Sequence, residues 1–243
     1  MSLQGQTWWL VGASEGLGRA LAEAMSIEGA TLILSARNSE RLVDLAETLP
    51  DARALAVDVT DDASVTGAAA EVGTVDGVIF LAGTYWPMRA QEWDTGKALA
   101  MINVNLLGAM RLVGAVLPGM LARDTGRLVL TGSLAGFRGL PGSIGYGASK
   151  AGLMNLAQSL QVDLQATGVR VQLVNPGFIR TRLTAKNGFA MPFIQSPDKA
   201  ATEVMRALRS GRPMTSFPMV FSWLFRAGRL FPTALWNRIF ARR

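Results

Sequence analysis

The sequence predicts an α/β domain in which a parallel sheet is covered by helices. Short apolar segments of strand type alternate with amphipathic helical segments along most of the chain. A glycine-rich turn joins the first of these strands to the first helix. With 243 residues, of which 49% are apolar and 17% charged, the chain is large enough to bury a substantial core. No repeat or linker divides it, so we expect one domain, residues 1–218, followed by a C-terminal tail, residues 219–243.

The first half of the chain predicts two strand–helix–strand units and one further strand. We expect strands over residues 7–11, 31–37, 52–59 and 76–83, and helices over residues 17–27, 39–48 and 62–72. The segment 76–83 is almost entirely apolar, as expected of a strand that is buried on both faces of a parallel sheet. Such sheets bind ligands at the carboxyl ends of their strands, so we expect the functional site at that edge.

The second half continues the alternation of helices and strands. We expect helices over residues 97–123, 146–166 and 198–210, and strands over residues 126–133, 169–177 and 214–217. Residues 84–96 are expected to form a loop or a short helix. Residues 181–197 are too long for a tight connection and are interpreted as a lid.

The composition excludes several kinds of chemistry. The chain has no His and no Cys. This excludes a Ser-His-Asp triad, a zinc site with His or Cys ligands and thiol chemistry, and we expect no metal site. Proton transfer near neutral pH would therefore depend on Tyr, Lys or a carboxylate. We find no run of about 18 apolar residues and no signal-peptide pattern, so a cytoplasmic protein is expected.

The glycine-rich turn reads Gly12-Ala13-Ser14-Glu15-Gly16-Leu17-Gly18. Its place between a strand and a helix is typical of a turn that holds the pyrophosphate of a dinucleotide at the helix N-terminus. The spacing is Gly-x-x-x-Gly-x-Gly rather than Gly-x-Gly-x-x-Gly, and a turn without a ligand is the alternative interpretation.

The end of the second strand bears on the choice of cofactor. An acidic residue at this place bonds the adenosine ribose in NAD-binding proteins. This chain has Ala36 and Arg37 instead, so no carboxylate repels a 2′-phosphate and a guanidinium is present to bind one. The pattern favours NADP(H), with a solvated Arg37 as the alternative.

Tyr146 and Lys150 form the candidate acid–base pair. They are four residues apart, so they share one face of a helix. An ammonium group beside a phenol is expected to lower the pKa of the phenol. Alone, a Tyr-x-x-x-Lys pair is usually a surface pair. Ser133 lies at the tip of the fifth strand, thirteen residues before Tyr146, and Asn105 is an amide inside an apolar helix that is either satisfied structurally or functional.

Taken together, these motifs resemble the short-chain dehydrogenase/reductase family in its branch of roughly 250 residues, over about residues 5–217. Asp58 matches the family's adenine contact, Ala82-Gly83 the end of an Asn-Asn-Ala-Gly motif, and Pro176-Gly177 with Thr181 the nicotinamide segment. Asn105, Ser133, Tyr146 and Lys150 match the catalytic tetrad. By this resemblance, the cofactor-binding residues would be Gly12, Ser14, Glu15, Gly16, Leu17, Gly18, Arg37, Asp58, Val59, Ala82, Gly83, Tyr146, Lys150, Pro176, Gly177, Ile179 and Thr181.

The resemblance implies a single-domain Rossmann fold, a doubly wound seven-stranded parallel sheet with helices on both faces, in a homodimer or homotetramer. It implies that Tyr146 is the acid/base, that Ser133 bonds the same substrate oxygen, and that Lys150 lowers the Tyr146 pKa and bonds the nicotinamide ribose. Asn105 would hold a water in a proton relay. Three features depart from the family pattern: Phe80-Leu81 replaces two asparagines, Glu15 stands where NADP(H)-preferring members have Arg or Lys, and the usual C-terminal ending is missing.

The C-terminal tail is basic and aromatic. Residues 204–243 contain eight Arg and no acid, whereas residues 1–203 have a net charge of −2. Apolar residues recur at helical spacing on both sides of Pro232, which predicts two short amphipathic helices. The tail could pack against its own body or a second subunit, or lie on a membrane surface with Arg at the lipid phosphates. Nucleic acid is disfavoured as a partner because the helices are so apolar.

We therefore expect an oxidoreductase that transfers a hydride between NADP(H) and a secondary alcohol/ketone or an aldehyde. NAD(H) is the alternative cofactor. An apolar substrate is expected from Phe189, Met191, Phe193 and the tail. The alternative function is a nicotinamide-binding scaffold or regulatory protein docked on a membrane surface by its tail.

Overall fold

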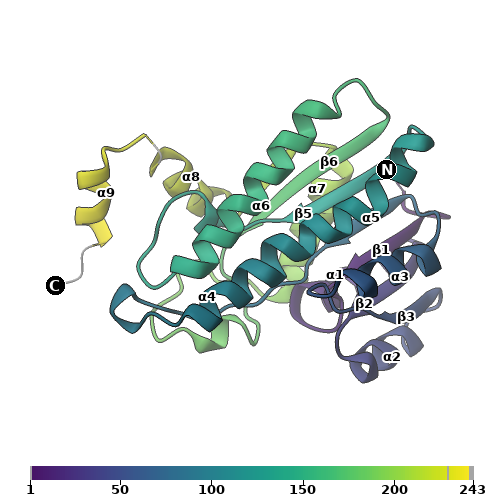
Figure 1. Ribbon diagram of the computed structural model, residues 1–243, viewed down its shortest axis with the longest axis horizontal. Coiled ribbons are helices and arrows are strands. Elements are labelled where there is room, and N and C mark those ends of the chain that lie inside the picture. Colours follow the sequence, from purple (N-terminus) through teal and green to yellow (C-terminus); the bar gives the residue numbers. More distant parts are fainter. Residues whose placement is uncertain (1, 229, 241–243) are drawn as a thin grey trace.

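The computed structural model describes residues 2–228 and 230–240, so Arg229, Arg242 and Arg243 of the tail lie outside it. A central parallel sheet has the strand order β3-β2-β1-β4-β5-β6-β7. The strands are β1 (Thr7–Val11), β2 (Thr31–Ala36), β3 (Ala52–Ala56), β4 (Gly77–Phe80), β5 (Gly126–Thr131), β6 (Val169–Pro176) and β7 (Met214–Phe217). This confirms the predicted seven-stranded, doubly wound sheet, and Figure 1 shows helices on both of its faces.

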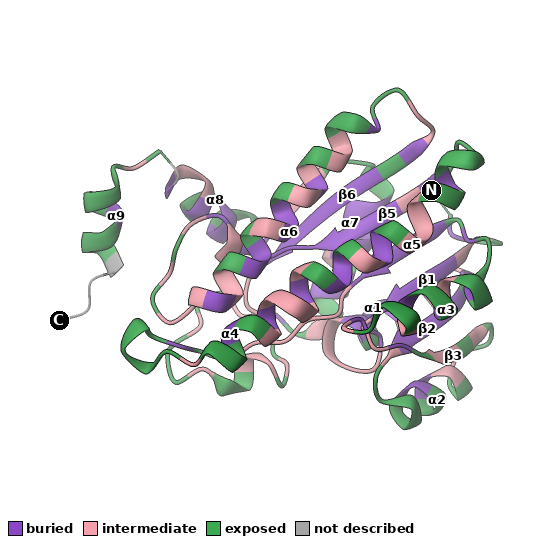
Figure 2. Ribbon diagram, in the orientation of Figure 1, coloured by how far each residue is buried: buried purple, intermediate pink, exposed green. Residues whose placement is uncertain are grey.

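The helices fall into two layers that cover opposite faces of the sheet. The longer helices are α1 (Gly16–Ile27), α2 (Ser39–Glu47), α3 (Asp62–Val72), α4 (Thr95–Ile102), α5 (Gly108–Ala122), α6 (Ile144–Asp163), α7 (Pro197–Ser210), α8 (Met219–Gly228) and α9 (Thr233–Phe240). One buried cluster joins the sheet to α1, α2 and α7, and the other joins it to α3, α5 and α6 (Figure 2). The predicted helices and strands agree with these elements, with helix and strand ends shifted by a few residues, and the one helix predicted over residues 97–123 is divided into α4 and α5.

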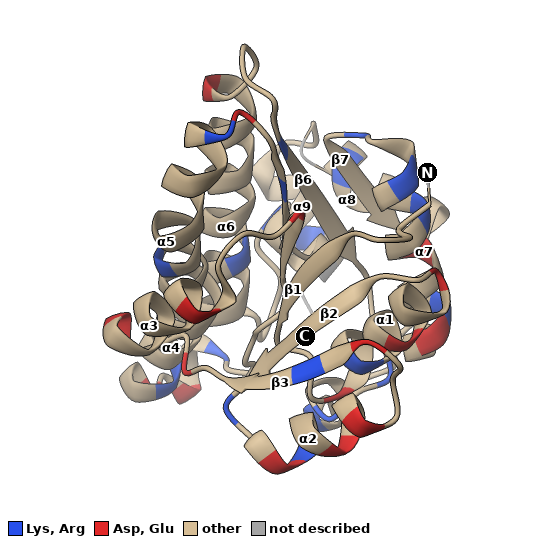
Figure 3. Ribbon diagram, turned by 90° about the vertical axis from the view of Figure 1, so that its right-hand side faces the viewer, with Lys and Arg blue, Asp and Glu red and all other residues tan. Residues whose placement is uncertain are grey.

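The two tryptophans of β1 show how one strand supports both layers. Adjacent strand residues point to opposite faces, so Trp8 enters one cluster and Trp9 the other, and both are fully buried. Trp9 Nε1 donates to Ser35 Oγ at 2.8 Å, and Trp8 Nε1 donates to Gln6 Oε1 at 3.0 Å. A side chain at Gly77 would collide with the Trp8 ring, because a Cβ there would lie 2.3 Å from it. Figure 3 shows most charged residues on the helices and loops and none on β1 or β2, whereas β3, β5 and β6 each carry one arginine.

One long helical segment, Thr95–Ala122, comprises α4, a π-helical turn η2 (Asn103–Leu107) and α5. By length and composition alone it is apolar enough to cross a membrane, with a mean hydropathy of 1.6. It packs instead against α3 and α6. The π-helical turn contains Asn105 and is not indicated by the sequence periodicity.

The strand order reverses between β1 and β4, and this places the site. β1 pairs with β2 on one side and β4 on the other, so the turns that leave β1 and β4 meet at the carboxyl edge. Gly12 has φ +103°, and a Cβ there would lie 2.4 Å from the Ala82 nitrogen. A Cβ at Gly18 would lie 2.1 Å from the Gly12 carbonyl oxygen. Glycine is therefore required at both positions, which leaves the α1 N-terminus open to the cleft between these turns.

Candidate active site

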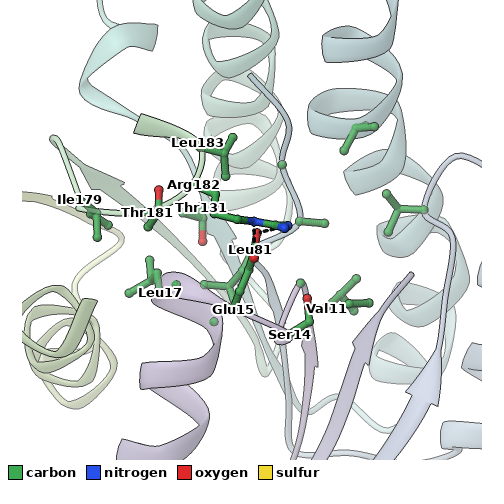
Figure 4. A pocket seen from close by; sticks show the side chains of 18 of the residues that line it. Val11, Ser14, Glu15, Leu17, Leu81, Thr131, Ile179, Thr181, Arg182 and Leu183 are labelled. Atoms are coloured by element: carbon green, nitrogen blue, oxygen red, sulfur yellow. Dashed lines mark hydrogen bonds and ion pairs between the residues drawn. The ribbon is translucent and has the colours of Figure 1, made fainter. Parts of the chain in front are cut away.

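One cleft at the carboxyl edge of the sheet brings the predicted residues together. Its lining includes all seventeen predicted cofactor-binding residues and Ser133. Asn105 does not line it and is buried behind Gly83. Figure 4 shows the part of this cleft between the glycine turn, α1 and the first residues of the lid.

The catalytic candidates come from two elements that meet at the tip of β5. Ser133 is 7% exposed and accepts a hydrogen bond from the Ala135 N–H at 3.2 Å, which fixes it at the start of a short 3-10 helix, η3 (Leu134–Gly136). Tyr146 lies in the first turn of α6 and is hydrogen-bonded to Ser133. Lys150 Nζ lies 5.9 Å from the centre of the Tyr146 ring. A hydroxyl, a phenol and an ammonium group therefore converge on one point of the cleft.

The pKa of Tyr146 differs from the sequence expectation. Burial raises it, and the hydrogen bond with Ser133 lowers it by less. The raised pKa contradicts the expected lowering: Lys150 is not among the groups that lower it, and the Lys150 ammonium donates to the Thr131 carbonyl at 2.7 Å. The phenol is therefore protonated at neutral pH and is set to donate its proton.

Lys150 is the most deeply buried charged group of the site. It is 4% exposed, and burial lowers its pKa to about 8. The charged form is disfavoured in the folded protein relative to the unfolded chain, where the pKa is near 10.5. Burial of the Lys150 ammonium group in the site therefore lowers the stability of the folded protein.

The lowered pKa of Lys150 predicts that the stability of the protein depends on pH. A lysine pKa that is lower in the folded state destabilises the protein below about pH 8, and the destabilisation disappears as the pH rises toward 10.5. Wild type should therefore gain roughly 3 kcal/mol of unfolding free energy relative to Lys150→Met between pH 7 and 10.5. Urea unfolding of both proteins across this range measures the difference. Lys199→Met, at an exposed position of α7, serves as the control. If the difference in unfolding free energy between wild type and Lys150→Met does not change with pH, the prediction that Lys150 is a buried, charged group is contradicted.

The side-chain amide of Asn105 is satisfied by hydrogen bonds. This agrees with one of the two interpretations that the sequence left open. Its Oδ1 accepts from the Thr84 N–H at 2.7 Å, and its Nδ2 donates to the Thr84 carbonyl at 3.0 Å and to Ser149 Oγ at 2.9 Å. Ser149 lies between Tyr146 and Lys150 on α6. Asn105 therefore ties the segment after β4 to the helix that carries the acid–base pair.

The cofactor side of the cleft has the donors that a dinucleotide requires. Arg37 follows β2, and its positive charge is among the causes that lower the pKa of Asp58, after the hydrogen bonds from Thr60. Glu15 is the N-cap residue of α1, and its side chain accepts no capping hydrogen bond, so the helix N-terminus is left for a ligand. The buried Thr131 Oγ1 also lines the cleft and has no hydrogen-bond partner among the described residues. The residues present fit a nicotinamide dinucleotide.

The sequence prediction missed several polar residues of this cleft, among them Asn38, Arg41 and Arg182. Arg41 is four residues after Arg37, in the first turn of α2, and this spacing was a signal that could have identified it. Arg182 directly follows Thr181 at the start of the lid, and no sequence pattern indicates which way it points.

Tyr85 forms an aromatic wall beside Tyr146, and further aromatic residues lie in the lid. The Tyr85 ring meets the Tyr146 ring edge-on with centroids 5.0 Å apart, and its hydroxyl donates to Asn187 Oδ1 of the lid at 2.7 Å. Burial raises the pKa of Tyr85 to about 12, so this phenol stays neutral. Phe193 of the lid has φ +57°, an unusual conformation for a bulky residue, and its ring lies 5.5 Å from that of Phe221 in α8.

Part of the C-terminal tail packs against the rest of the same chain, which is one of the alternatives predicted from the sequence. Phe221, Phe225 and Trp236 are at most 8% exposed and join the buried cluster that includes β5 and β6. Trp236 Nε1 donates to the Gly139 carbonyl at 2.8 Å, and the guanidinium of Arg138 stacks over its ring. The predicted break at Pro232 falls between α8 and α9. Exposed apolar residues remain on α8, namely Met219, Val220, Trp223 and Leu224.

Comparisons with known proteins agree with this geometry. The family model described as short chain dehydrogenase matches residues 6–190. An uncharacterized oxidoreductase of Myxococcus xanthus is 36% identical over 96% of this chain and 95% of its own length. A 3-oxoacyl-(acyl-carrier-protein) reductase, FabG, of Salmonella typhimurium is 34% identical over 76% of this chain and 78% of its own. The structure of a short-chain dehydrogenase from Sphingobium yanoikuyae in complex with NADPH has a TM-score of 0.83 and 27% identity, over 98% and 96% of the two chains.

Proposed function

The chain belongs to the short-chain dehydrogenase family of NAD(P)-dependent oxidoreductases, and from this membership we propose that it reduces ketones or aldehydes with NADPH. The observation that carries the proposal is the convergence of Tyr146, Ser133 and Lys150 on the cleft that also contains the glycine turn and Arg37. When bound, the nicotinamide supplies the hydride. The chain's own residues would then bind the carbonyl oxygen and provide the proton.

Each of the three residues Tyr146, Ser133 and Lys150 has a distinct task in this proposal. Tyr146 donates its phenolic proton to the substrate oxygen as negative charge develops there, and its raised pKa means that the proton is present at neutral pH. The Ser133 hydroxyl bonds the same oxygen and stabilises that charge. Lys150 contributes a positive charge near the phenol and a donor toward the cofactor ribose. In the oxidation direction Tyr146 would accept the proton instead.

The cofactor preference and the substrate class are also proposals. Arg37 supports NADP(H), and the similar structure from Sphingobium yanoikuyae is a complex with NADPH. Tyr85 beside Tyr146, together with Phe189 and Phe193 of the lid, supports an apolar substrate. NAD(H) remains the alternative cofactor.

The function is tested with purified protein, NADPH and a panel of ketones and aldehydes of increasing chain length. We expect carbonyl-dependent oxidation of NADPH, followed at its nicotinamide absorbance. The scaffold alternative predicts the opposite pattern, in which NADPH binds and no carbonyl in the panel is reduced.

A further inference from the structure

Glu15, in the glycine turn, is held by two arginines from different parts of the chain. Arg182 of the lid forms a two-pronged contact, with Nη2 donating to Oε1 at 2.8 Å and Nε lying 2.7 Å from Oε2. Arg41 of α2 donates through Nη1 to Oε2 at 2.9 Å. Figure 4 shows the side chains of Glu15 and Arg182 meeting between α1 and the lid. One carboxylate thus connects the glycine turn, α2 and the lid.

The surroundings keep these three groups at the cofactor cleft. Asn38 Oδ1 accepts from the Arg41 N–H at 2.9 Å, which fixes the first turn of α2. The lid is close to the glycine turn, because a Cβ at Gly16 would lie 2.9 Å from the Thr181 methyl group. Glu15, Arg41 and Arg182 all line the cleft. Their side chains are partly exposed, at 34%, 44% and 69%, so the contacts can exchange.

We infer that the Glu15 carboxylate competes with a cofactor phosphate for the guanidinium groups of Arg182 and Arg41. This inference rests on the proposed function. Carboxylates and phosphates both accept paired hydrogen bonds from a guanidinium, so they compete for the same donors. A dinucleotide phosphate at the α1 N-terminus or beside Arg37 must take Arg182 or Arg41 from Glu15. Glu15 then stands near it as an unneutralised like charge.

This competition gives Glu15 a defined effect on the cofactor. It weakens dinucleotide binding and speeds release, because the carboxylate recaptures Arg182 as the phosphate leaves. It also couples release to the lid, since Arg182 directly follows Thr181 at the start of the lid. The position that carries Arg or Lys in many NADP(H)-preferring relatives would here regulate the residence time of the cofactor.

The test measures NADPH binding, by quenching of protein fluorescence, and NADPH dissociation, by stopped flow. Glu15→Gln should bind NADPH about three- to tenfold more tightly and release it more slowly, because both guanidiniums are freed and the like charge is gone. Arg182→Gln should weaken binding by a similar factor. In the Arg182→Gln background, the gain from Glu15→Gln should shrink, because one of the two contested arginines is absent.

Glu23→Gln is the matched control, since Glu23 forms an ion pair with Arg19 on α1 outside the cleft. It should leave NADPH affinity unchanged. Wild-type or weaker binding by a Glu15→Gln protein with an unchanged melting temperature would overturn the inference, as would unchanged binding by Arg182→Gln. The failure of wild type to bind either NADPH or NADH would instead overturn the proposed function.

Discussion

Replacing Tyr146 by Phe is expected to lower kcat for carbonyl reduction by about 10²- to 10⁴-fold, the usual contribution of a positioned general acid. The substitution removes only the hydroxyl that is hydrogen-bonded to Ser133. The ring and its edge contact with Tyr85 are retained. NADPH affinity should therefore stay within about twofold of wild type, and the loss should appear in kcat.

Tyr85→Phe is the matched control for this substitution. It removes a second phenolic hydroxyl from the same wall, one that donates to Asn187 of the lid. The Tyr85 hydroxyl is already engaged with the lid residue Asn187 and not with Ser133, so its loss should mainly change KM. Full activity of Tyr146→Phe, or an equal loss of kcat in both variants, would contradict the assignment of Tyr146 as the acid.

Arg37→Asp is expected to weaken NADPH binding by roughly 10²-fold while leaving NADH binding unchanged or improved. The change removes a charge-assisted hydrogen bond to the 2′-phosphate and places a carboxylate beside it. NADH lacks this phosphate and meets a residue able to bond its ribose hydroxyls. Titration of both cofactors against wild type and variant measures the change in selectivity.

Arg170→Asp reverses a charge at an exposed position near the amino end of β6, the end opposite the cleft. It controls for the general effect of net charge on binding of an anion. Both cofactors should bind this variant as they bind wild type. If Arg37→Asp and Arg170→Asp weaken NADPH binding equally, Arg37 is only a solvated side chain, as one interpretation of the sequence allows.

The fold was predictable because its determinants are local and repeated. The apolar segment around Trp8 and Trp9, the glycine turn after it and the helix that follows each agree with one architecture. Chain-order rules then place the carboxyl ends of the strands at one edge, which brings Gly12, Ser133 and Pro176 to the same cleft. Residue types and spacing were sufficient for this part.

Other features depend on contacts that sequence spacing does not encode. The π-helical turn at Asn105 continues an otherwise regular helical periodicity, so nothing in the pattern marks it. The Tyr146 pKa is raised by burial, and the Lys150 ammonium donates to the Thr131 carbonyl; neither contact follows from the spacing of the pair. One of the two arginine partners of Glu15, Arg182, is 167 positions away in the chain.

The tail illustrates the same limit. Its helical periodicity predicted two amphipathic helices correctly. The periodicity shows which face of a helix is apolar, but not which part of the protein packs against that face. The structure shows that Phe221 and Trp236 are covered by the chain itself, whereas Trp223 of the same segment is 61% exposed. Only the packed structure separates these two groups of residues.

The most direct test of the central claim follows the hydride itself. Purified protein is incubated with NADPH deuterated at C4 of the nicotinamide and with an apolar ketone or aldehyde, and the alcohol is examined by mass spectrometry. We predict one deuterium on the carbinol carbon of the product in wild type, and at least a hundredfold slower labelling in Tyr146→Phe. Saturable NADPH binding without deuterium transfer to any carbonyl in the panel would contradict the account.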